Sequence, residues 1–188
     1  MDQPILENEK QLVWEFYKQL DSAKVSEIGD IIAAHTTEHH VWLGYHPFDE
    51  IKGSKEIANL FWAPFRNAVS NMQRRVDIFL AGKNEIDNFN STWVVSMGHL
   101  MGLFDNAWLG IQPTGKMIFL RYCEFNRIEN GKIAQTAMYF DIPHFMIQAG
   151  YKPFPNATAA HLVQPGPMTH NGLLFNQQDP KEGEKTLS

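Results

Sequence analysis

Two residues that could do acid–base chemistry, Glu124 and His99, lie in predicted strands. Glu124 falls within 117–128, a run rich in Ile, Phe, Leu and Tyr that predicts a β-strand. Apolar surroundings disfavour a charged carboxyl group and raise its pKa toward the range useful for taking a proton. We therefore take Glu124 as the candidate base. His99 is the candidate donor to a carbonyl oxygen, and the alternative for it is a core histidine hydrogen-bonded to a neighbouring strand.

A predicted hairpin and a short helix position Glu124. Asn130-Gly131 stands between two β-like runs, which is a strong signal for a two-residue turn. The chain returns over 132–141, and Pro143 suits the first turn of a helix that Gly150 can end. The turn of residues 112–115 precedes the hairpin.

Strand alternation assigns the polar residues of the hairpin to two faces. Tyr122 and Glu124 share one face, whereas Arg121 points to the other. On the returning strand, Met138 is expected on the face of Glu124, and Asp141 on the opposite face. Two arrangements remain open for Arg121 and Asp141: an ion pair outside the site, or a bulge that brings both inside to orient the catalytic groups.

The remaining elements predict an α+β fold, with a strongly curved, mostly antiparallel sheet wrapped around N-terminal helices. Helical spacing of apolar residues marks the helices, and alternation marks the strands. Pro64 should kink or divide the third helix. In chain order the predictions are helices over 5–20, 25–32 and 54–65, with a short strand at 41–44, then strands over 72–81 and 92–104. A concavity between sheet and helices is the expected ligand pocket.

The composition excludes several classes of function. The 188 residues carry a net charge of −5, without the basic stripe that nucleic-acid binding needs. No apolar run reaches the roughly 20 residues that span a bilayer, and residues 1–10 do not resemble a signal peptide. We therefore expect a cytoplasmic protein with no nucleic-acid or membrane partner.

Other residue types that often mark sites give weaker signals here. His35, His39 and His40 do not follow a metal-ligand spacing, so we expect no metal. Cys123, the one cysteine, is interpreted as a small buried hydrophobe. Aromatic side chains fill cores more often than they bind ligands, but four tryptophans are candidate walls for a flat apolar ligand. These are Trp42, Trp62, Trp93 and Trp108, with Tyr122 as a further binding candidate.

The composition changes after Gly150. Residues 1–150 are predicted to form one domain, and residues 151–188 a proline-rich extension that packs on the domain or on a partner subunit. The residues from Gln177 onward are expected to be mobile. With the exposed face of a curved sheet, this extension favours a homodimer.

Motifs in the second half of the chain resemble those of SnoaL-like polyketide cyclases, in the nuclear transport factor 2-like superfamily. Gly-x-x-Pro-Thr-Gly occurs at 110–115, Arg-Ile-x-x-Gly-Lys-Ile at 127–133, and Gln-Ala-Gly at 148–150. The overall resemblance covers about residues 5 to 150. It implies a cone-shaped α+β fold and a pocket that, in the cyclases, promotes an aldol closure without a cofactor. Aligned on 127–133, the family's catalytic His corresponds to Glu124, and its acid/base Asp corresponds to Met138.

Three functions follow as hypotheses. The first is a cofactor-independent enzyme of lyase or isomerase type acting on a small apolar carbonyl compound, with Glu124 as base and His99 as donor. The second is a non-catalytic ligand-binding module, favoured by Met138 because a thioether cannot transfer protons. The third is a dimeric scaffold whose concavity is filled by residues 151–175.

Overall fold

One six-stranded sheet organises the part of the chain that the structure, a computed structural model, describes, residues 6–155. The strand order is β2-β1-β6-β5-β4-β3, and β1 and β6 are the parallel pair. The strands are β1 (Thr36–Gly44), β2 (Glu50–Lys52), β3 (Val69–Lys83), β4 (Thr92–Phe104), β5 (Met117–Glu129) and β6 (Lys132–Phe140). The sheet is not closed. The predicted α+β class is confirmed.

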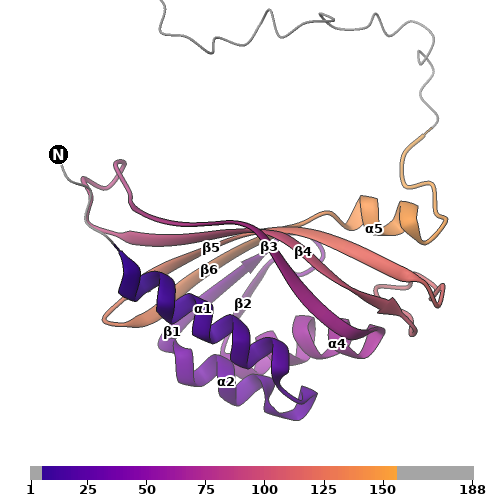
Figure 1. Ribbon diagram of the computed structural model, residues 1–188, viewed down its shortest axis with the longest axis horizontal. Coiled ribbons are helices and arrows are strands. Elements are labelled where there is room, and N and C mark those ends of the chain that lie inside the picture. Colours follow the sequence, from indigo (N-terminus) through magenta and orange to yellow (C-terminus); the bar gives the residue numbers. More distant parts are fainter. Residues whose placement is uncertain (1–5, 156–188) are drawn as a thin grey trace, which may run out of the picture. The chain divides into compact units, whose positions relative to one another are not determined.

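Helices gather on one side of this sheet, where α1, α2 and α4 lie together (Figure 1). The helical elements are α1 (Glu7–Ser22), η1 (Val25–Glu27), α2 (Ile28–His35), α3 (Ser54–Ile57), η2 (Ala58–Trp62), α4 (Ala63–Ala68) and α5 (Ile142–Gln148). The apolar stripe of α1 buries Val13, Phe16, Tyr17 and Leu20, as its spacing predicts. We call the sheet surface toward these helices the inner face and the opposite surface the outer face.

Pro64 divides the third predicted helix by way of a π-helical turn. Residues 54–57 form α3, residues 58–62 form the π turn η2, and Pro64 lies in the first turn of α4. Proline has no N–H to donate to the preceding turn, so the wider π turn accommodates a missing hydrogen bond.

The hairpin of β5 and β6 forms at the predicted place. Asn130 and Gly131 both have positive φ, 49° and 72°, as the two central residues of a type I′ turn require. The register pairs Glu124 with Met138 and Asn126 with Thr136. Directly paired residues of neighbouring strands share a face, so all four side chains belong to the inner face.

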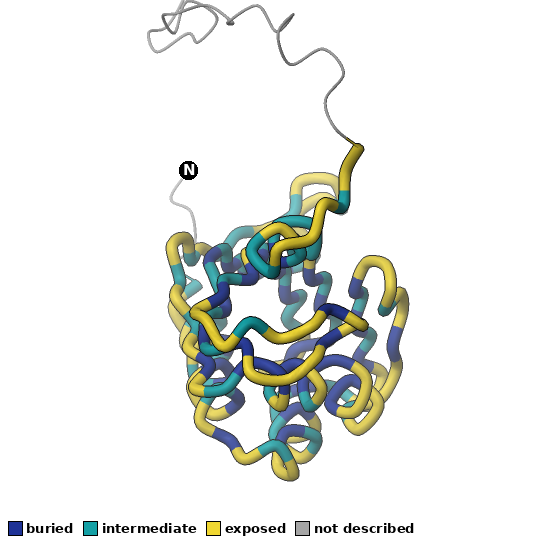
Figure 2. The backbone as a smooth tube through the Cα atoms, turned by 90° about the vertical axis from the view of Figure 1, so that its right-hand side faces the viewer, coloured by how far each residue is buried: buried dark blue, intermediate teal, exposed yellow. Residues whose placement is uncertain are grey.

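Burial alternates along β4 without interruption, which separates the two faces of the sheet. Figure 2 shows buried and less buried residues alternating along the chain. Val94, Ser96 and Leu100 are buried on the inner face. Trp93 and His99 are half-buried, and they lie on the outer face.

Two register shifts in β3 break the alternation that its sequence predicts. They fall between Ser70 and Gln73 and between Val76 and Ile78. The second shift turns Ile78 to the outer face, where it is 44% exposed, instead of leaving it on the face of Val76. Ile78 therefore shares the outer face with Leu80, and Val76 lies on the inner face.

Glycines on β4 make room for these shifts. A Cβ added at Gly98 would overlap the carbonyl oxygen of Arg75, and one at Gly102 would lie 2.5 Å from the carbonyl oxygen of Ser70. The backbone of β3 therefore packs directly on β4 at both places.

The first strand is longer than the sequence predicts. β1 begins at Thr36, so the histidine-rich run belongs to the strand, and β2 forms where no strand was predicted. His40 is buried, whereas His39 is exposed.

A side chain of helix α5 hydrogen-bonds to the edge of β5 where no strand pairs with it. β6 ends at Phe140, opposite Tyr122, and leaves the start of β5 without a neighbouring strand on that side. The amide of Gln148 fills the gap: its Oε1 accepts from Phe119 N (2.9 Å) and its Nε2 donates to Phe119 O (2.7 Å). The predicted start and end of this helix, at Pro143 and near Gly150, agree with the structure.

Residues 156–188, most of the predicted extension, lie outside the described residues, and so does most of the segment 151–175 of the scaffold hypothesis. Among the helices of the described part, none has the length and hydropathy needed to cross a membrane.

Candidate functional site

Glu124 lies at the centre of the inner face. It is 2% exposed, and it is paired with Ser96 of β4 on one side and Met138 of β6 on the other. A carboxyl group buried this deeply needs a compensating charge or a proton.

Arg74 of β3 supplies that charge. Its Nη1 donates to Glu124 Oε2 over 3.3 Å, while its Nε and Nη2 donate to both oxygens of Asp21, from the end of α1, over 3.0 and 3.3 Å. The Arg74 side chain is 3% exposed, and that of Asp21 is 21% exposed. Of the five N–H groups of a guanidinium, three donate to these carboxylates.

Aromatic rings enclose the guanidinium. The Cζ atom of Arg74 lies 4.0 Å from the ring centroid of Tyr17, 5.2 Å from that of Tyr122 and 5.5 Å from that of Trp62. Rings at these distances attract a cation and exclude water from it. The arginine is held as a fixed positive group in a largely dry site.

Burial sets the proton affinity of the cluster. Burial raises the pKa of Glu124, although Arg74 and Asn126 favour its charged form and act in the opposite direction. Burial alone would lower the pKa of Arg74, but the carboxylates of Asp21 and Glu124 more than offset it, and the guanidinium stays charged. One cation thus faces two carboxyl groups, and burial favours the protonated form of Glu124.

Hydroxyl and amide groups complete the polar cluster. Asn126 Nδ2 donates to Glu124 Oε1 (3.3 Å) and to the hydroxyl oxygen of Tyr17 (3.2 Å). The hydroxyls of Ser96 and Tyr122 lie 2.8 Å apart. Burial raises the pKa of Tyr17 and Tyr122, so both phenols remain protonated donors at neutral pH.

A pocket of about 500 Å³ between α1 and β3 reaches this cluster. Arg74, Asp21 and Tyr17 contribute to its wall, and the Arg74 side chain is only 3% exposed. The full lining is Trp14, Tyr17, Lys18, Asp21, Ser22, Met72, Gln73, Arg74 and Val76. Glu124 is absent from this lining. Arg74 therefore links the pocket to Glu124, and we call this space the α1–β3 pocket.

His99 lies on the other side of the sheet from Glu124. It pairs with Arg121 on the outer face, its Nδ1 is 3.1 Å from Asp77 Oδ2, and its Nε2 accepts from Arg121 Nε at 3.5 Å. The expectation that His99 and Glu124 share one site is wrong. The alternation was assigned correctly, but the apolar neighbours of His99 belong to the outer face.

Arg121 and Asp141 do not orient Glu124. Arg121 is exposed on the outer face, and β5 has no bulge beside it. Asp141 accepts a hydrogen bond from His144 N and caps α5, so the expected ion pair between Arg121 and Asp141 does not form either. Their assignment to the site is not supported by their positions.

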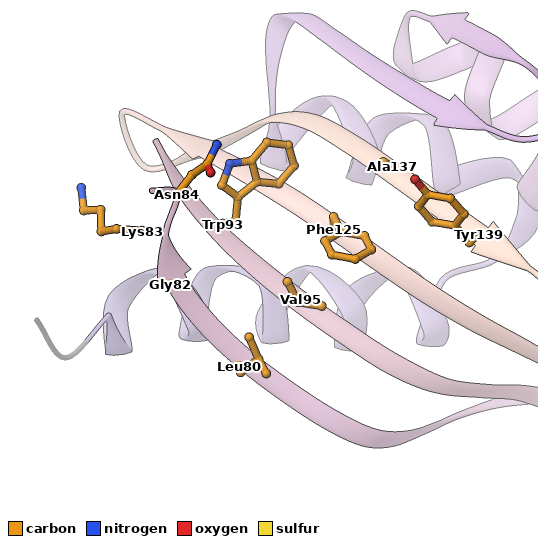
Figure 3. A pocket seen from close by; sticks show the side chains of 9 residues that line it. All are labelled: Leu80, Gly82, Lys83, Asn84, Trp93, Val95, Phe125, Ala137 and Tyr139. Carbon is orange, nitrogen blue, oxygen red and sulfur yellow. The ribbon is translucent and has the colours of Figure 1, made fainter. Parts of the chain in front are cut away.

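The tryptophans divide between the two faces. Trp93 lies on the outer face, where its Nε1 donates to Ser91, and it lines a shallow apolar hollow together with Phe125 and Tyr139 (Figure 3). The strands in Figure 3 cross in front of α1, so this hollow is on the face away from the helices.

Trp42, Trp108 and Met138 belong to the core of the inner face. Each is at most 2% exposed, and both tryptophans pack against Phe61, with ring centroids 5.0 Å and 6.4 Å away. Trp62 contacts Arg74 as described above. The two core tryptophans are packed by protein side chains and do not contribute to the α1–β3 pocket.

The sequence did not identify Arg74, Asp21 or Tyr17 as site residues. Tyr17 falls within the helix predicted over 5–20 from apolar spacing, and Asp21 follows the predicted end of that helix. A signal was present for Tyr17, because its hydroxyl on the buried stripe of a helix needs a polar partner. The sequence contains no such signal for Arg74, since its position on the inner face depends on the irregular path of β3.

The described residues contain no group of three or more His, Cys, Asp or Glu side chains arranged to hold a metal ion.

Comparison with known proteins identifies the fold as that of nuclear transport factor 2-like proteins. AclR from Streptomyces galilaeus is similar over 80% of this chain and 85% of its own, with a TM-score of 0.61 and 18% identity. An NTF2-like protein from Burkholderia thailandensis is similar over 81% of this chain and 100% of its own (TM-score 0.54, 17% identity). IdmH from Streptomyces antibioticus is similar over 73% of this chain and 98% of its own (TM-score 0.57, 13% identity).

A family model assigns the chain to one family within that fold. The model of the SnoaL-like polyketide cyclases matches residues 11–149, and the chain belongs to this family. Among curated proteins nothing matches. The resemblance found in the sequence motifs is confirmed.

Proposed function

We propose that this SnoaL-like protein is a cofactor-independent enzyme that removes a proton from the carbon beside the carbonyl group of a small apolar compound. The substrate occupies the α1–β3 pocket, with its carbonyl oxygen at Arg74, and Glu124 is the base. The observation that carries the proposal is the position of Arg74, which lines the pocket and also donates to a buried carboxyl group.

Arg74 couples substrate binding to the strength of the base. A carbonyl oxygen at the guanidinium competes with Glu124 for the long 3.3 Å hydrogen bond from Nη1. As the oxygen takes that bond, Glu124 loses its stabilising partner, becomes a stronger base and is uncovered toward the pocket. Negative charge then moves from the carboxylate to the substrate oxygen, where Arg74 and the hydroxyl of Tyr17 stabilise it.

Exchange of carbon-bound hydrogen provides the test, because it reports the first step without knowledge of the natural substrate. We would incubate 2-tetralone with the full-length protein in deuterated buffer and follow its α-hydrogens by proton NMR. The wild type should accelerate the exchange over buffer. Glu124→Gln, which keeps the shape and removes the base, should lose at least about 100-fold of that acceleration, the usual contribution of a general base.

Two controls separate the base from other effects. Asp77→Asn changes a carboxylate on the outer face, and His99→Gln changes the histidine beside it; both should exchange 2-tetralone like the wild type. An unchanged rate in Glu124→Gln, or an equal loss in Asp77→Asn, would reject Glu124 as the base.

A non-catalytic ligand-binding module is the second candidate. It is favoured by Met138, which is fully buried opposite Glu124 at the position of the family's acid/base Asp, and by the absence of Glu124 from the pocket lining. Native mass spectrometry with 2-tetralone distinguishes the two candidates. Binding that Arg74→Met abolishes, without any exchange by the wild type, supports the module.

A further inference from the structure

A chain of hydrogen bonds continues from Glu124 across the inner face to β1. Asn126, which donates to Glu124, has its Oδ1 held by the hydroxyl of Thr136 on β6 over 2.7 Å. The same hydroxyl oxygen lies 3.0 Å from Nε2 of His40 on β1. Asn126, Thr136 and His40 are 0%, 4% and 5% exposed, so water does not compete for these contacts.

The hydrogens in this chain have one consistent direction. A threonine hydroxyl carries a single hydrogen, and that of Thr136 goes to Asn126. Its oxygen therefore accepts from His40, which must carry its ring hydrogen on Nε2. Nδ1 of His40 is then a bare acceptor, and it is buried without a partner among the described residues. Burial lowers the pKa of His40 to about 4, so the ring carries only one hydrogen at neutral pH.

This direction decides which end of the Asn126 amide faces Glu124. An asparagine can present either its oxygen or its nitrogen, and the oxygen would repel a carboxylate. With Oδ1 held by Thr136, Nδ2 is left to donate to Glu124 Oε1 and to Tyr17. Each donor in the sequence His40, Thr136, Asn126 thus points toward the carboxyl group.

We propose that His40 and Thr136 are positioning residues for Glu124, which act by holding the Asn126 amide with its nitrogen toward the carboxyl group. A side-chain amide does not pass protons along a chain of hydrogen bonds. The arrangement therefore orients the Asn126 amide and does not transfer protons to Glu124. The proposal concerns how strongly Glu124 holds its proton, and it stands whether or not the protein turns over a substrate.

The other groups around Glu124 make no hydrogen bond to Thr136 or His40 among the described residues. Arg74 from β3 favours the charged carboxylate, while Asp21 and Tyr17 from α1 and Tyr122 from β5 surround the same cluster. Ser96 of β4 is uncharged. A change in the pKa of Glu124 in a Thr136 variant therefore reports the Asn126 amide.

Thr136→Val provides the direct test, since valine has the shape of threonine and no hydroxyl. Without the Thr136 hydroxyl, the Asn126 amide can turn its oxygen toward Glu124. The pKa of Glu124 should then rise by about one pH unit, which makes it a roughly tenfold weaker acid. The measurement is a carbon-13 NMR titration of the glutamate side-chain carboxyls in the full-length protein. The resonance that disappears in Glu124→Gln identifies the residue.

Matched variants keep the test specific. Thr136→Ser retains the hydroxyl and should restore the wild-type pKa. Thr92→Val removes a hydroxyl from another buried threonine of the sheet and should leave Glu124 unchanged. An unshifted pKa in Thr136→Val, a serine variant that behaves like valine, or an equal shift in Thr92→Val would overturn the proposal.

His40 supplies the comparison if Thr136→Val does not fold. His40→Gln keeps an N–H donor for the Thr136 oxygen, whereas His40→Met removes it. The proposal expects a higher Glu124 pKa in the methionine variant alone, and equal values in the two variants would overturn it.

Discussion

Replacing Arg74 by methionine tests the charge balance of the buried cluster. Methionine keeps an unbranched stem of similar length and removes the cation between Asp21 and Glu124. Removing one partner of a buried ion pair usually costs about 3–5 kcal/mol. Asp21 retains contact with water, whereas Glu124 is 2% exposed, so most of this cost falls on Glu124.

The cost should depend on pH in a defined direction. Burial already raises the pKa of Glu124, and loss of Arg74 raises it further. A group with a raised folded-state pKa stabilises the fold at low pH, and that contribution is lost as pH rises through the folded pKa. Arg74→Met should therefore be least stable at pH 8. On acidification toward pH 5 it should regain up to about 1.4 kcal/mol per pH unit relative to the wild type.

Thermal unfolding followed by circular dichroism measures the effect. For a chain of this size, 3–5 kcal/mol corresponds to a decrease in Tm of roughly 10 °C at pH 8. The matched control is Arg75→Met on the outer face, where the arginine is 70% exposed and its loss should cost less than about 1 kcal/mol. Adding Glu124→Gln to Arg74→Met should restore part of the loss, because no charge then remains buried.

Three results would refute this reasoning. Arg74→Met could cost no more than Arg75→Met, its loss could be the same at pH 5 and pH 8, or the double variant with Glu124→Gln could be no more stable than Arg74→Met.

Four further outcomes are expected. Because the pKa of His40 is lowered to about 4, its contribution to stability is full above pH 6.5 and is lost as pH falls through 6.5 toward 4. Over that range, the free energy of unfolding measured by urea titration should fall by about 3 kcal/mol more in the wild type than in His40→Gln. Gln148→Ala should lower the free energy of unfolding by about 1–3 kcal/mol, as two backbone hydrogen bonds are lost. Leu80→Asp should convert the proposed outer-face homodimer to monomer in size-exclusion chromatography with light scattering, whereas Leu60→Asp, exposed on the helical side, should not. His99→Gln should change thermal stability by less than about 1 kcal/mol, since its partners are partly solvated.

Local patterns in the sequence predict most of the fold. The Asn130-Gly131 turn, the alternation of β4 and β5 and the proline at the start of α5 each depend on a few adjacent residues, and each agrees with the structure. β2 was missed because three residues are too few for a periodic signal.

The site was harder to predict because it depends on which face of a strand turns inward. The pairing of Glu124 with Met138 on one face was predicted correctly, because it follows from the alternation of β5 and β6 on either side of the Asn130-Gly131 turn. His99 was misplaced because Trp93, Val95 and Met97 make the outer face of β4 as apolar as the inner one. Periodicity gives the pairing of residues on a face but not the side on which the helices lie.

The register shifts in β3 have a consequence for transplanting or redesigning this site. Arg74 enters the cluster from a strand whose path requires Gly98 on its neighbour, because the backbone of β3 leaves no room for a side chain there. If Arg74, Asp21 and Glu124 were grafted onto a regular sheet, the Arg74 side chain would no longer reach Glu124. The transferable unit is therefore the irregular pair β3 and β4, with its glycines, together with α1 and β5, which carry Asp21 and Glu124.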